Sequence, residues 1–173
     1  MPLVTTPTPP FQPFYAAHSA AVLRLLVGMV GPTDAEDCFQ DTFLKALRAW
    51  PPADTGAGAR TDSWVLTIAH RTALDLLRRS GREVPVDALP EQAVVDDDDR
   101  VLATLDAGAM WTAVRALPPK QRGAVVLRSV LDLSHAQVAE VLACSEAAAR
   151  RSYADGIAAL RGRVEQGELE VNR

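Results

Sequence analysis

Cysteine and aromatic residues are both scarce in this chain of 173 residues. The two cysteines, Cys38 and Cys144, fall at apolar positions of expected helices, so we predict buried thiols rather than a disulfide or a metal site. Aromatic residues make up only 5% of the chain, whereas hydrophobic residues make up 48%, with alanine, leucine and valine dominant. This composition favours helices over strands and predicts an all-α fold.

Long hydrophobic runs are absent as well. Arg24 interrupts the best apolar stretch, residues 22–30, so no run approaches the ~20 residues that a membrane span needs. Residues 1–14 contain five prolines and neither lysine nor arginine, a composition unlike that of a signal peptide or a helix. We therefore expect a flexible arm over residues 1–13, a cytoplasmic location and no membrane insertion.

The three histidines are isolated from one another along the chain. His18, His70 and His135 belong to separate expected elements, with no nucleophile and no metal-ligand spacing around them. We therefore predict no catalytic residues, no metal and no cofactor, and we do not expect an enzyme.

The negative charge of the chain is confined to one segment. The formal net charge is −4, yet residues 87–106 alone contain seven acidic residues and a single arginine. Because this segment lies between two strongly periodic regions, it is predicted to be a solvated linker. The expected organisation is a helical domain at 14–82, an acidic linker at 83–106, a second helical domain at 107–162 and a tail at 163–173.

Residues 34–50 are the most informative segment. Their apolar residues, Leu47 included, recur at helical spacing and are expected to be buried, while the polar face is acidic early and basic late. That charge order suits the helix dipole, and Thr33 with Glu36 has the spacing of a capping box at the helix start. The pattern predicts a surface helix that can dock on a basic partner. Its predicted exposed residues are Asp37, Gln40, Asp41, Lys45 and Arg48.

The third expected helix, residues 63–79, carries a basic ridge. Arg71, Asp75, Arg78 and Arg82 follow one another at helical spacings, with Arg79 beside them. Such a ridge can track the phosphates of a nucleic acid. Arginines also suit the C-terminal end of a helix dipole, so the pattern alone leaves both interpretations open.

The second expected domain ends in two helices joined by a tight turn. Ser134 and Ser145 have the positions of N-caps for helices at 135–143 and 146–161. This arrangement is a helix-turn-helix signature, whose second helix would enter the major groove of DNA, although such hairpins are also ordinary packing units. The residues predicted to face outward near the start of that helix are Glu146, Ala147, Arg150, Arg151 and Ala154.

Three motifs, in order along the chain, resemble those of bacterial sigma factors. Asp34-Ala-Glu-Asp-Cys-Phe-Gln-Asp-Thr-Phe is similar to D-A-E-D-x-x-Q-E-T-F, and residues 64–79 are similar to W-L-x-x-I-A-R-N-x-x-x-D-x-x-R-R. Residues 116–122, 126–128 and 133–146 resemble the promoter-reading C-terminal domain of the family. Over about residues 14–162, the chain therefore resembles the extracytoplasmic-function (ECF) sigma factors of the sigma-70 family.

The resemblance implies partners for each of these surfaces. The helix at 34–50 would dock on the clamp helices of the largest subunit of core RNA polymerase, through Asp37, Gln40, Asp41 and Lys45. The third helix and the loop before it would bind the melting −10 element of promoter DNA, and the helix at 146–161 would bind the −35 element as duplex. The −10 candidates are Arg71, Asp75, Arg78, Arg79 and Arg82, and the −35 candidates are Glu146, Ala147, Arg150, Arg151 and Ala154. Family members are often held inactive by an anti-sigma factor, although no residue here identifies one.

The expected recognition helix departs from the family's pattern. It carries fewer basic residues, Asp155 would face the phosphates, and Gly156 weakens a helix by ~1 kcal/mol relative to alanine. Ala143 also replaces the usual glycine of the turn. Binding of the −35 element is therefore expected to be either weak or unusually specific. An alternative is a sigma-like decoy that binds an anti-sigma regulator instead of promoter DNA, although an intact polymerase-facing helix favours a sigma factor.

Overall fold

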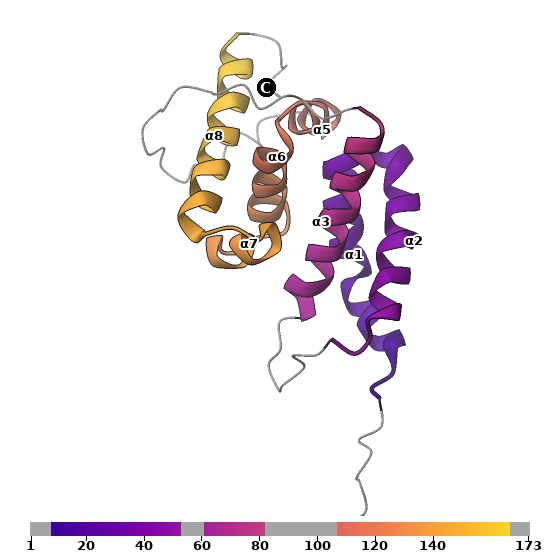
Figure 1. Cartoon of the computed structure of the whole chain (residues 1–173). Helices are drawn as coiled ribbons and strands as arrows, with labels where there is room; N and C mark the ends of the chain where they lie inside the picture. Colours follow the sequence, from indigo (N-terminus) through magenta and orange to yellow (C-terminus); the bar gives the residue numbers. More distant parts are fainter. Residues whose placement is uncertain (1–7, 53–60, 82–106, 167–173) are drawn as a thin grey trace, which may run out of the picture.

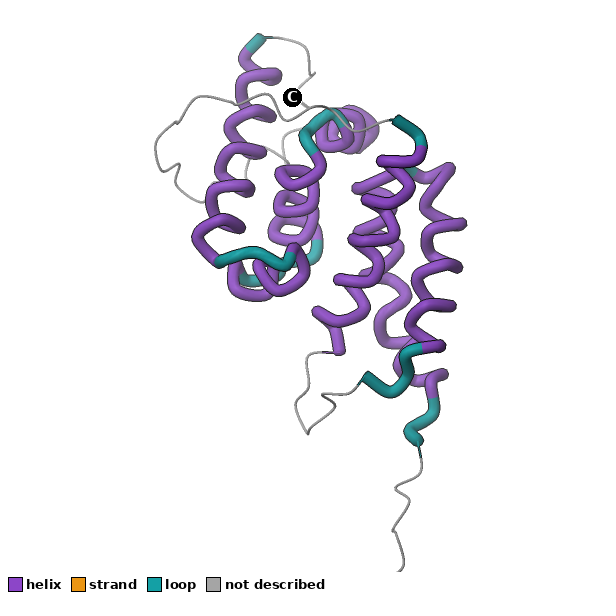
Figure 2. Tube along the Cα trace, in the orientation of Figure 1, coloured by secondary structure: helices purple, strands orange, loops and turns teal. Residues whose placement is uncertain are grey.

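The computed structural model describes residues 8–52, 61–81 and 107–166, and every regular element within these ranges is helical (Figures 1 and 2). The predicted all-α fold is confirmed. The expected linker at 83–106 lies outside the described residues, as do Arg82 and residues 1–7, 53–60 and 167–173. The elements are α1 (Phe11–Val30), α2 (Pro32–Arg48), α3 (Thr61–Arg79), α5 (Ala107–Arg115), α6 (Pro119–Val125), the π-helical turn η1 (Val126–Val130), α7 (His135–Leu142) and α8 (Glu146–Glu165).

The first two helices begin earlier than the sequence predicted. Helix α1 starts at Phe11 and so includes Pro13, which we had placed in a flexible arm. Proline is tolerated in the first turn of a helix, because the N–H that it lacks would be unpaired there in any case. Helix α2 starts at Pro32, directly after Gly31, whose positive φ of 90° makes the sharp break between α1 and α2.

The predicted capping box at the start of α2 is wrong. The N-cap is Gly31, which has no side chain to cap the helix, and Thr33 lies inside the first turn. Pro32 occupies the first helical position instead, with its φ already suited to a helix. Asp34 in the first turn and Lys45 in the last turn still complement the helix dipole as expected.

The few aromatic residues are concentrated where α1, α2 and α3 meet. Trp50 stands at the centre of this group, with ring centroids 5.4 Å from Phe11, 4.6 Å from Phe14 and 6.3 Å from Trp64. Its indole N–H also donates to the Pro9 carbonyl over 2.7 Å, which ties the chain before α1 to the end of α2. Large rings bury much apolar area for each residue, so a few of them are enough to hold three helices together.

Helix α1 is the central helix of the fold. It packs against α2 and α3 on one side and against α5, α6 and η1 on the other, and Val22, Leu25 and Leu26 are fully buried. A helix that is buried on several sides reads as apolar nearly all round. By length and composition α1 could also cross a membrane, and it is the one such helix among the described residues, but the buried core helix of a globular protein passes the same test.

The two expected domains pack directly against each other and share one hydrophobic core. Helices α1 and α3 contact α5, α6, η1 and α7, whereas α2 lies at the opposite edge of the molecule, away from the second domain (Figure 1). Sequence periodicity predicted the helices of each domain, but it held no signal for this contact between them.

His70 lies buried in the contact between the two domains. Its Nε2 atom is 3.0 Å from the position that a Cβ would take on Gly123 of α6, and Nε2 has no hydrogen-bond partner. Burial, and secondarily the charge of Arg71, lower the pKa of His70 from 6.5 to about 4. The imidazole is therefore neutral in the folded chain at physiological pH.

The buried His70 predicts that the chain loses stability in mild acid. The unfolded chain binds a proton at His70 below pH 6.5, whereas the folded chain does so only near pH 4, so the free energy of unfolding falls as the pH drops. From these two pKa values we expect a loss of about 2 kcal/mol between pH 7.5 and pH 5. Urea unfolding at both pH values checks this. His70→Phe should remove that part of the pH dependence, and an equal loss in both proteins would contradict it.

Candidate functional site

The exposed face of α2 carries the acidic and amide residues expected from the sequence. Asp37 and Gln40 are exposed, and Asp41 is half exposed with its carboxylate 2.8 Å from the ammonium of Lys45. That ammonium also donates to the hydroxyl of the buried Thr72 on α3, over 3.0 Å. Lys45 therefore fastens α2 to α3, while the residues before it point to solvent.

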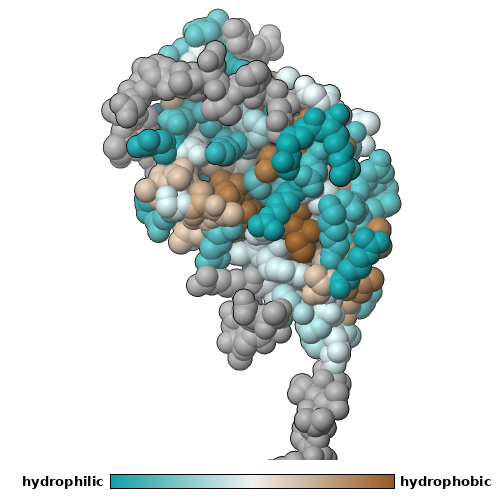
Figure 3. Space-filling view, in the orientation of Figure 1, coloured by the Kyte–Doolittle hydropathy of each residue, from teal (hydrophilic) through white to brown (hydrophobic). Residues whose placement is uncertain are grey.

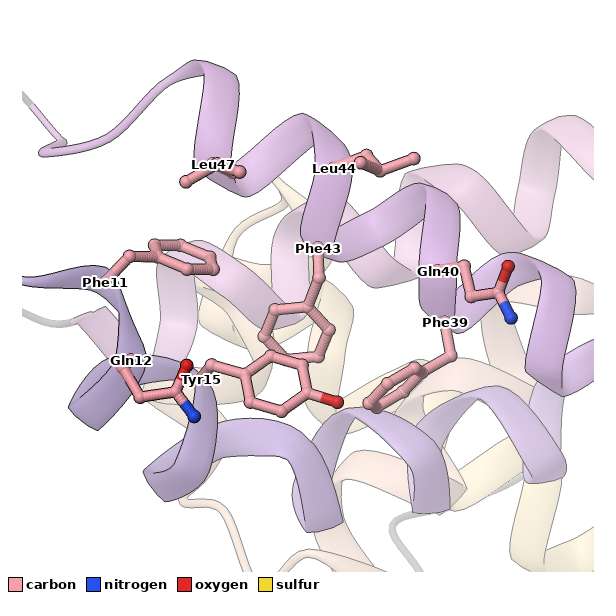
Figure 4. A pocket seen from close by; sticks show the side chains of 8 residues that line it. All are labelled: Phe11, Gln12, Tyr15, Phe39, Gln40, Phe43, Leu44 and Leu47. Atoms are coloured by element: carbon pink, nitrogen blue, oxygen red, sulfur yellow. The ribbon is translucent and has the colours of Figure 1, made fainter.

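An apolar groove runs beside this polar face, between the start of α1 and the second half of α2 (Figure 4). Its volume is about 420 Å³. Leu44 and Leu47 form one wall and are each 51% exposed, so the expectation that Leu47 is buried is wrong. The other lining residues are Phe11, Gln12, Tyr15, Phe39, Gln40 and Phe43.

The groove was missed because the helical stripe was read too broadly. Phe43, at the middle of the stripe, is buried against the rings of Tyr15 and Phe39. Leu44 and Leu47 lie three residues apart at the margin of that stripe, which is the spacing of anchors that receive a partner helix. Gln40 lines the groove and also belongs to the polar face, so the two features form one continuous surface of α2, which we call the α2 surface.

The basic ridge of α3 is exposed, and part of its charge is neutralised. Arg71, Arg78 and Arg79 all face solvent. The guanidinium of Arg78 makes an ion pair with the carboxylate of Asp75, at 2.5 Å. Hydrophilic side chains cover the face of the molecule over α3 and the neighbouring edge of α2 (Figure 3). The ridge therefore presents positive charge in a fixed row, as phosphate contact requires.

The helix-turn-helix unit is built as predicted. Ser134 caps α7 in a capping box with Gln137, and the hydroxyl of Ser145 accepts from the N–H of Ala148 at the start of α8. Ala143 takes the left-handed conformation that a glycine usually supplies, with φ at 52°. Cys144 lies exposed in this turn, so the prediction of a buried thiol is confirmed for Cys38 and wrong for Cys144.

The start of α8 faces outward, but its charges are partly paired. Glu146, Ala147, Arg150 and Arg151 are exposed, whereas Ala154 is only half exposed. A guanidinium nitrogen of Arg150 lies 2.5 Å from the carboxylate of Glu146. These two residues border a polar pocket of about 440 Å³, whose other walls come from the end of η1 and the start of α7.

Gly156 has a structural reason that the sequence did not reveal. A Cβ at this position would lie 2.7 Å from a methyl group of Val125, so α8 approaches α6 closely only because residue 156 is a glycine. The glycine therefore sets how α8 sits on α6, and its cost in helix propensity is offset by this packing.

The candidate residues form three separate surfaces. The α2 surface and the α3 ridge belong to one three-helix unit, joined by the Lys45–Thr72 contact. The exposed start of α8 belongs to the second unit, and α3 lies between α2 and that unit (Figure 1). Among the described residues, no group of three or more histidine, cysteine or acidic side chains could hold a metal ion.

Comparisons with known families and proteins match the same two units. Sigma-70 region 2 matches residues 14–83, and Sigma-70 region 4 matches residues 107–160. The chain is 31% identical to ECF RNA polymerase sigma factor SigC of Mycobacterium tuberculosis over 160 residues, which are 91% of this chain and 85% of SigC. It is 33% identical to RNA polymerase sigma factor CarQ of Myxococcus xanthus over 170 residues, which are 94% of each chain.

Solved structures share the fold. The sigma factor RpoE of Bartonella quintana, crystallised with the anti-sigma factor NepR, superposes with a TM-score of 0.69 at 19% identity, covering 90% of this chain and 96% of RpoE. The ECF sigma factor SigJ of Mycobacterium tuberculosis superposes with a TM-score of 0.55 at 29% identity, covering 90% of this chain and 57% of SigJ. With both regions matched in order, and relatives aligned over most of their length, the chain belongs to the extracytoplasmic-function sigma factors of the sigma-70 family.

Proposed function

We propose that this sigma factor docks on core RNA polymerase through the α2 surface and reads promoter DNA through α3 and α8. As an alternative sigma factor it has core RNA polymerase and promoter DNA as its partners. The observation that carries the proposal is the α2 surface, where exposed Asp37 and Gln40 adjoin the half-exposed Leu44 and Leu47. Apolar anchors beside a polar rim are what a helical partner with basic side chains would bind.

The DNA-contacting residues follow from exposure and charge. On α3, Arg71, Arg78 and Arg79 would neutralise phosphates of the melting −10 element, while Asp75 positions Arg78. On α8, Arg150 and Arg151 would reach base edges or phosphates of the −35 element, and Glu146 orients Arg150. The family acts in transcription initiation, in which the polymerase performs the chemistry. We accordingly place this chain in the cytoplasm and assign it no catalytic activity of its own.

Reversing one charge on the α2 surface should weaken binding to core polymerase. Asp37 is exposed near the start of the predicted docking face, so Asp37→Lys leaves the fold intact and places a like charge against a basic partner. We expect the dissociation constant for core RNA polymerase to rise about tenfold, with a smaller effect at high salt. Fluorescence anisotropy of the labelled full-length chain, titrated with core enzyme, measures it.

Glu165→Lys is the matched control for this experiment. Glu165 is exposed at the end of α8 and is not part of any of the three surfaces, yet its replacement changes the net charge by the same amount. It should bind core polymerase as the wild type does. If both variants lose affinity equally, net charge rather than the α2 surface governs docking, and the proposed site is wrong.

A second candidate function is that of a sigma-like decoy that sequesters an anti-sigma regulator. The pairing of Arg150 with Glu146 favours it, because it leaves Arg151 as the exposed arginine near the start of α8 without that neutralising partner. Titration of promoter duplex with the core-bound chain separates the two functions. A decoy would bind core polymerase without any preference for promoter over random duplex.

A further inference from the structure

The contact between the two domains is unusually close along α1. Gly28 lies inside α1, and an added Cβ there would be 2.7 Å from a methyl carbon of Val126 and 2.9 Å from the indole of Trp111. Val126 belongs to η1 and Trp111 to α5, so both neighbours come from the second domain. Any side chain at position 28 would therefore push the two domains apart.

A buried arginine fastens the same contact. Arg122 of α6 is 3% exposed, and its guanidinium donates to the Met29 carbonyl in the last turn of α1, over 2.5 Å. The same guanidinium donates twice to the Leu117 carbonyl, just beyond the end of α5, over 2.9 and 3.2 Å. Carbonyls at a helix C-terminus lack intrahelical partners and carry partial negative charge, so one cation satisfies helix ends from both domains.

The closed arrangement leaves each binding surface open. Asp37 and Gln40 on α2, Arg71 on α3 and Arg150 and Arg151 on α8 all remain exposed while the domains are packed together. The interface therefore covers other residues, chiefly the apolar faces of α1 and α3 and the imidazole of His70. What the packing restricts is the distance between α3 and α8.

That distance conflicts with the spacing of promoter elements. Sites centred 10 and 35 base pairs upstream of a start point lie about 25 base pairs apart, which is about 85 Å along B-form DNA. A compact chain of this length has a radius of gyration of about 16 Å and is about 40 Å across. The closed molecule is too small to place α3 on one element and α8 on the other.

We propose that the packed arrangement is a self-inhibited state, held by Arg122 and by the close approach at Gly28, which must open before the chain can span a promoter. This inference rests on the proposed function, because it takes α3 and α8 as the two DNA-reading helices. The clamp is internal to the chain: every contact that holds it joins α1 or α3 to α5, α6, η1 or α7. Core polymerase would favour the open form by engaging the two domains separately, so that binding and opening are coupled.

A wedge at Gly28 tests the proposal. Gly28→Leu blocks the closed contact but suits α1, since leucine is a far better helix former than glycine. In small-angle scattering of the full-length chain, we expect a larger radius of gyration with unchanged helical circular dichroism. Because the closed population no longer competes, the apparent affinity for core polymerase and the promoter-directed transcription at limiting sigma factor should rise about threefold or more.

Gly162→Leu is the matched control, because a Cβ at Gly162 meets nothing within 4 Å. It should behave as the wild type in scattering and in transcription. If Gly28→Leu loses helical signal, Trp111→Ala, which removes the opposing ring from the second domain, replaces it with the same expected results.

Each outcome decides the inference. Expansion together with greater activity supports it. Expansion without a gain in affinity or transcription shows that the closed form does not inhibit, and an unchanged radius of gyration shows that these contacts do not hold the chain shut. If the wild type itself fails to bind core polymerase, the proposed function fails, while the scattering comparison still reports on the closed state.

Discussion

Arg122→Met is expected to lower the free energy of unfolding by about 3 kcal/mol. Methionine fills a similar volume, but it donates no hydrogen bond, so the carbonyls of Met29 and Leu117 would lose a buried donor. Each buried acceptor left unpaired costs about 1–3 kcal/mol. Burial, with a smaller contribution from Arg115, lowers the pKa of Arg122 to about 10, so the side chain is charged at neutral pH and removing it also relieves some desolvation.

The acceptors decide the sign of this effect. Replacing both members of a buried ion pair by apolar residues is often neutral. Here the partners of Arg122 are backbone carbonyls, which no substitution can remove. For a chain of this size, about 3 kcal/mol corresponds to a fall in Tm of roughly 6–12 °C, measurable by calorimetry. Arg122→Lys, which keeps the charge but loses the forked geometry, should fall between the two. A methionine variant within 0.5 kcal/mol of the wild type would contradict the role of Arg122, given a typical error of about that size.

Charges placed on the groove wall of the α2 surface should have the largest effect on polymerase binding. In Leu44→Asp/Leu47→Asp, two half-exposed leucines become carboxylates that a docked helix would have to bury. Losing two apolar anchors and desolvating two charges costs about 3 kcal/mol or more, so we expect affinity for core polymerase to fall about 100-fold. The free protein should keep its thermal stability, since both side chains already face solvent.

Leu23→Asp is the matched control for the groove variant. Leu23 is 44% exposed on α1, nearly as exposed as the two groove leucines, but it does not line the groove. Titration calorimetry with core enzyme compares the three proteins. If Leu23→Asp weakens binding as much as the groove variant does, the groove is not the docking site. If neither weakens it, docking depends on the polar face alone.

Local features of this fold could be predicted from the sequence, because their causes are local. Ser134 and Ser145 mark helix starts through their own side chains, and the all-α fold follows from the periodicity of apolar residues. The capping box at Thr33 failed for a related reason: Pro32 and Gly31 supply a stronger start one residue earlier, and the spacing rule for caps does not weigh the two against each other.

Features that depend on distant parts of the chain were not predictable. Nothing near Gly28 in the sequence indicates that it meets Trp111, and Arg122 is read in isolation as one more basic residue. His70 was taken as an isolated histidine, although it is buried where the domains meet. The exposed leucines of the α2 surface were assigned to the core, since hydrophobic spacing shows which residues share a helix face but not where a neighbouring helix stops covering it.

Reconstituted transcription tests the central claim most directly. The full-length chain is added to core RNA polymerase on a library of genomic fragments, and the 5′ ends of the transcripts are mapped. The account predicts initiation that depends on the chain, from start points that share one element near −10 and a second near −35. Stable binding of core polymerase without initiation, or start points that share no upstream sequence, would contradict the account and favour the decoy.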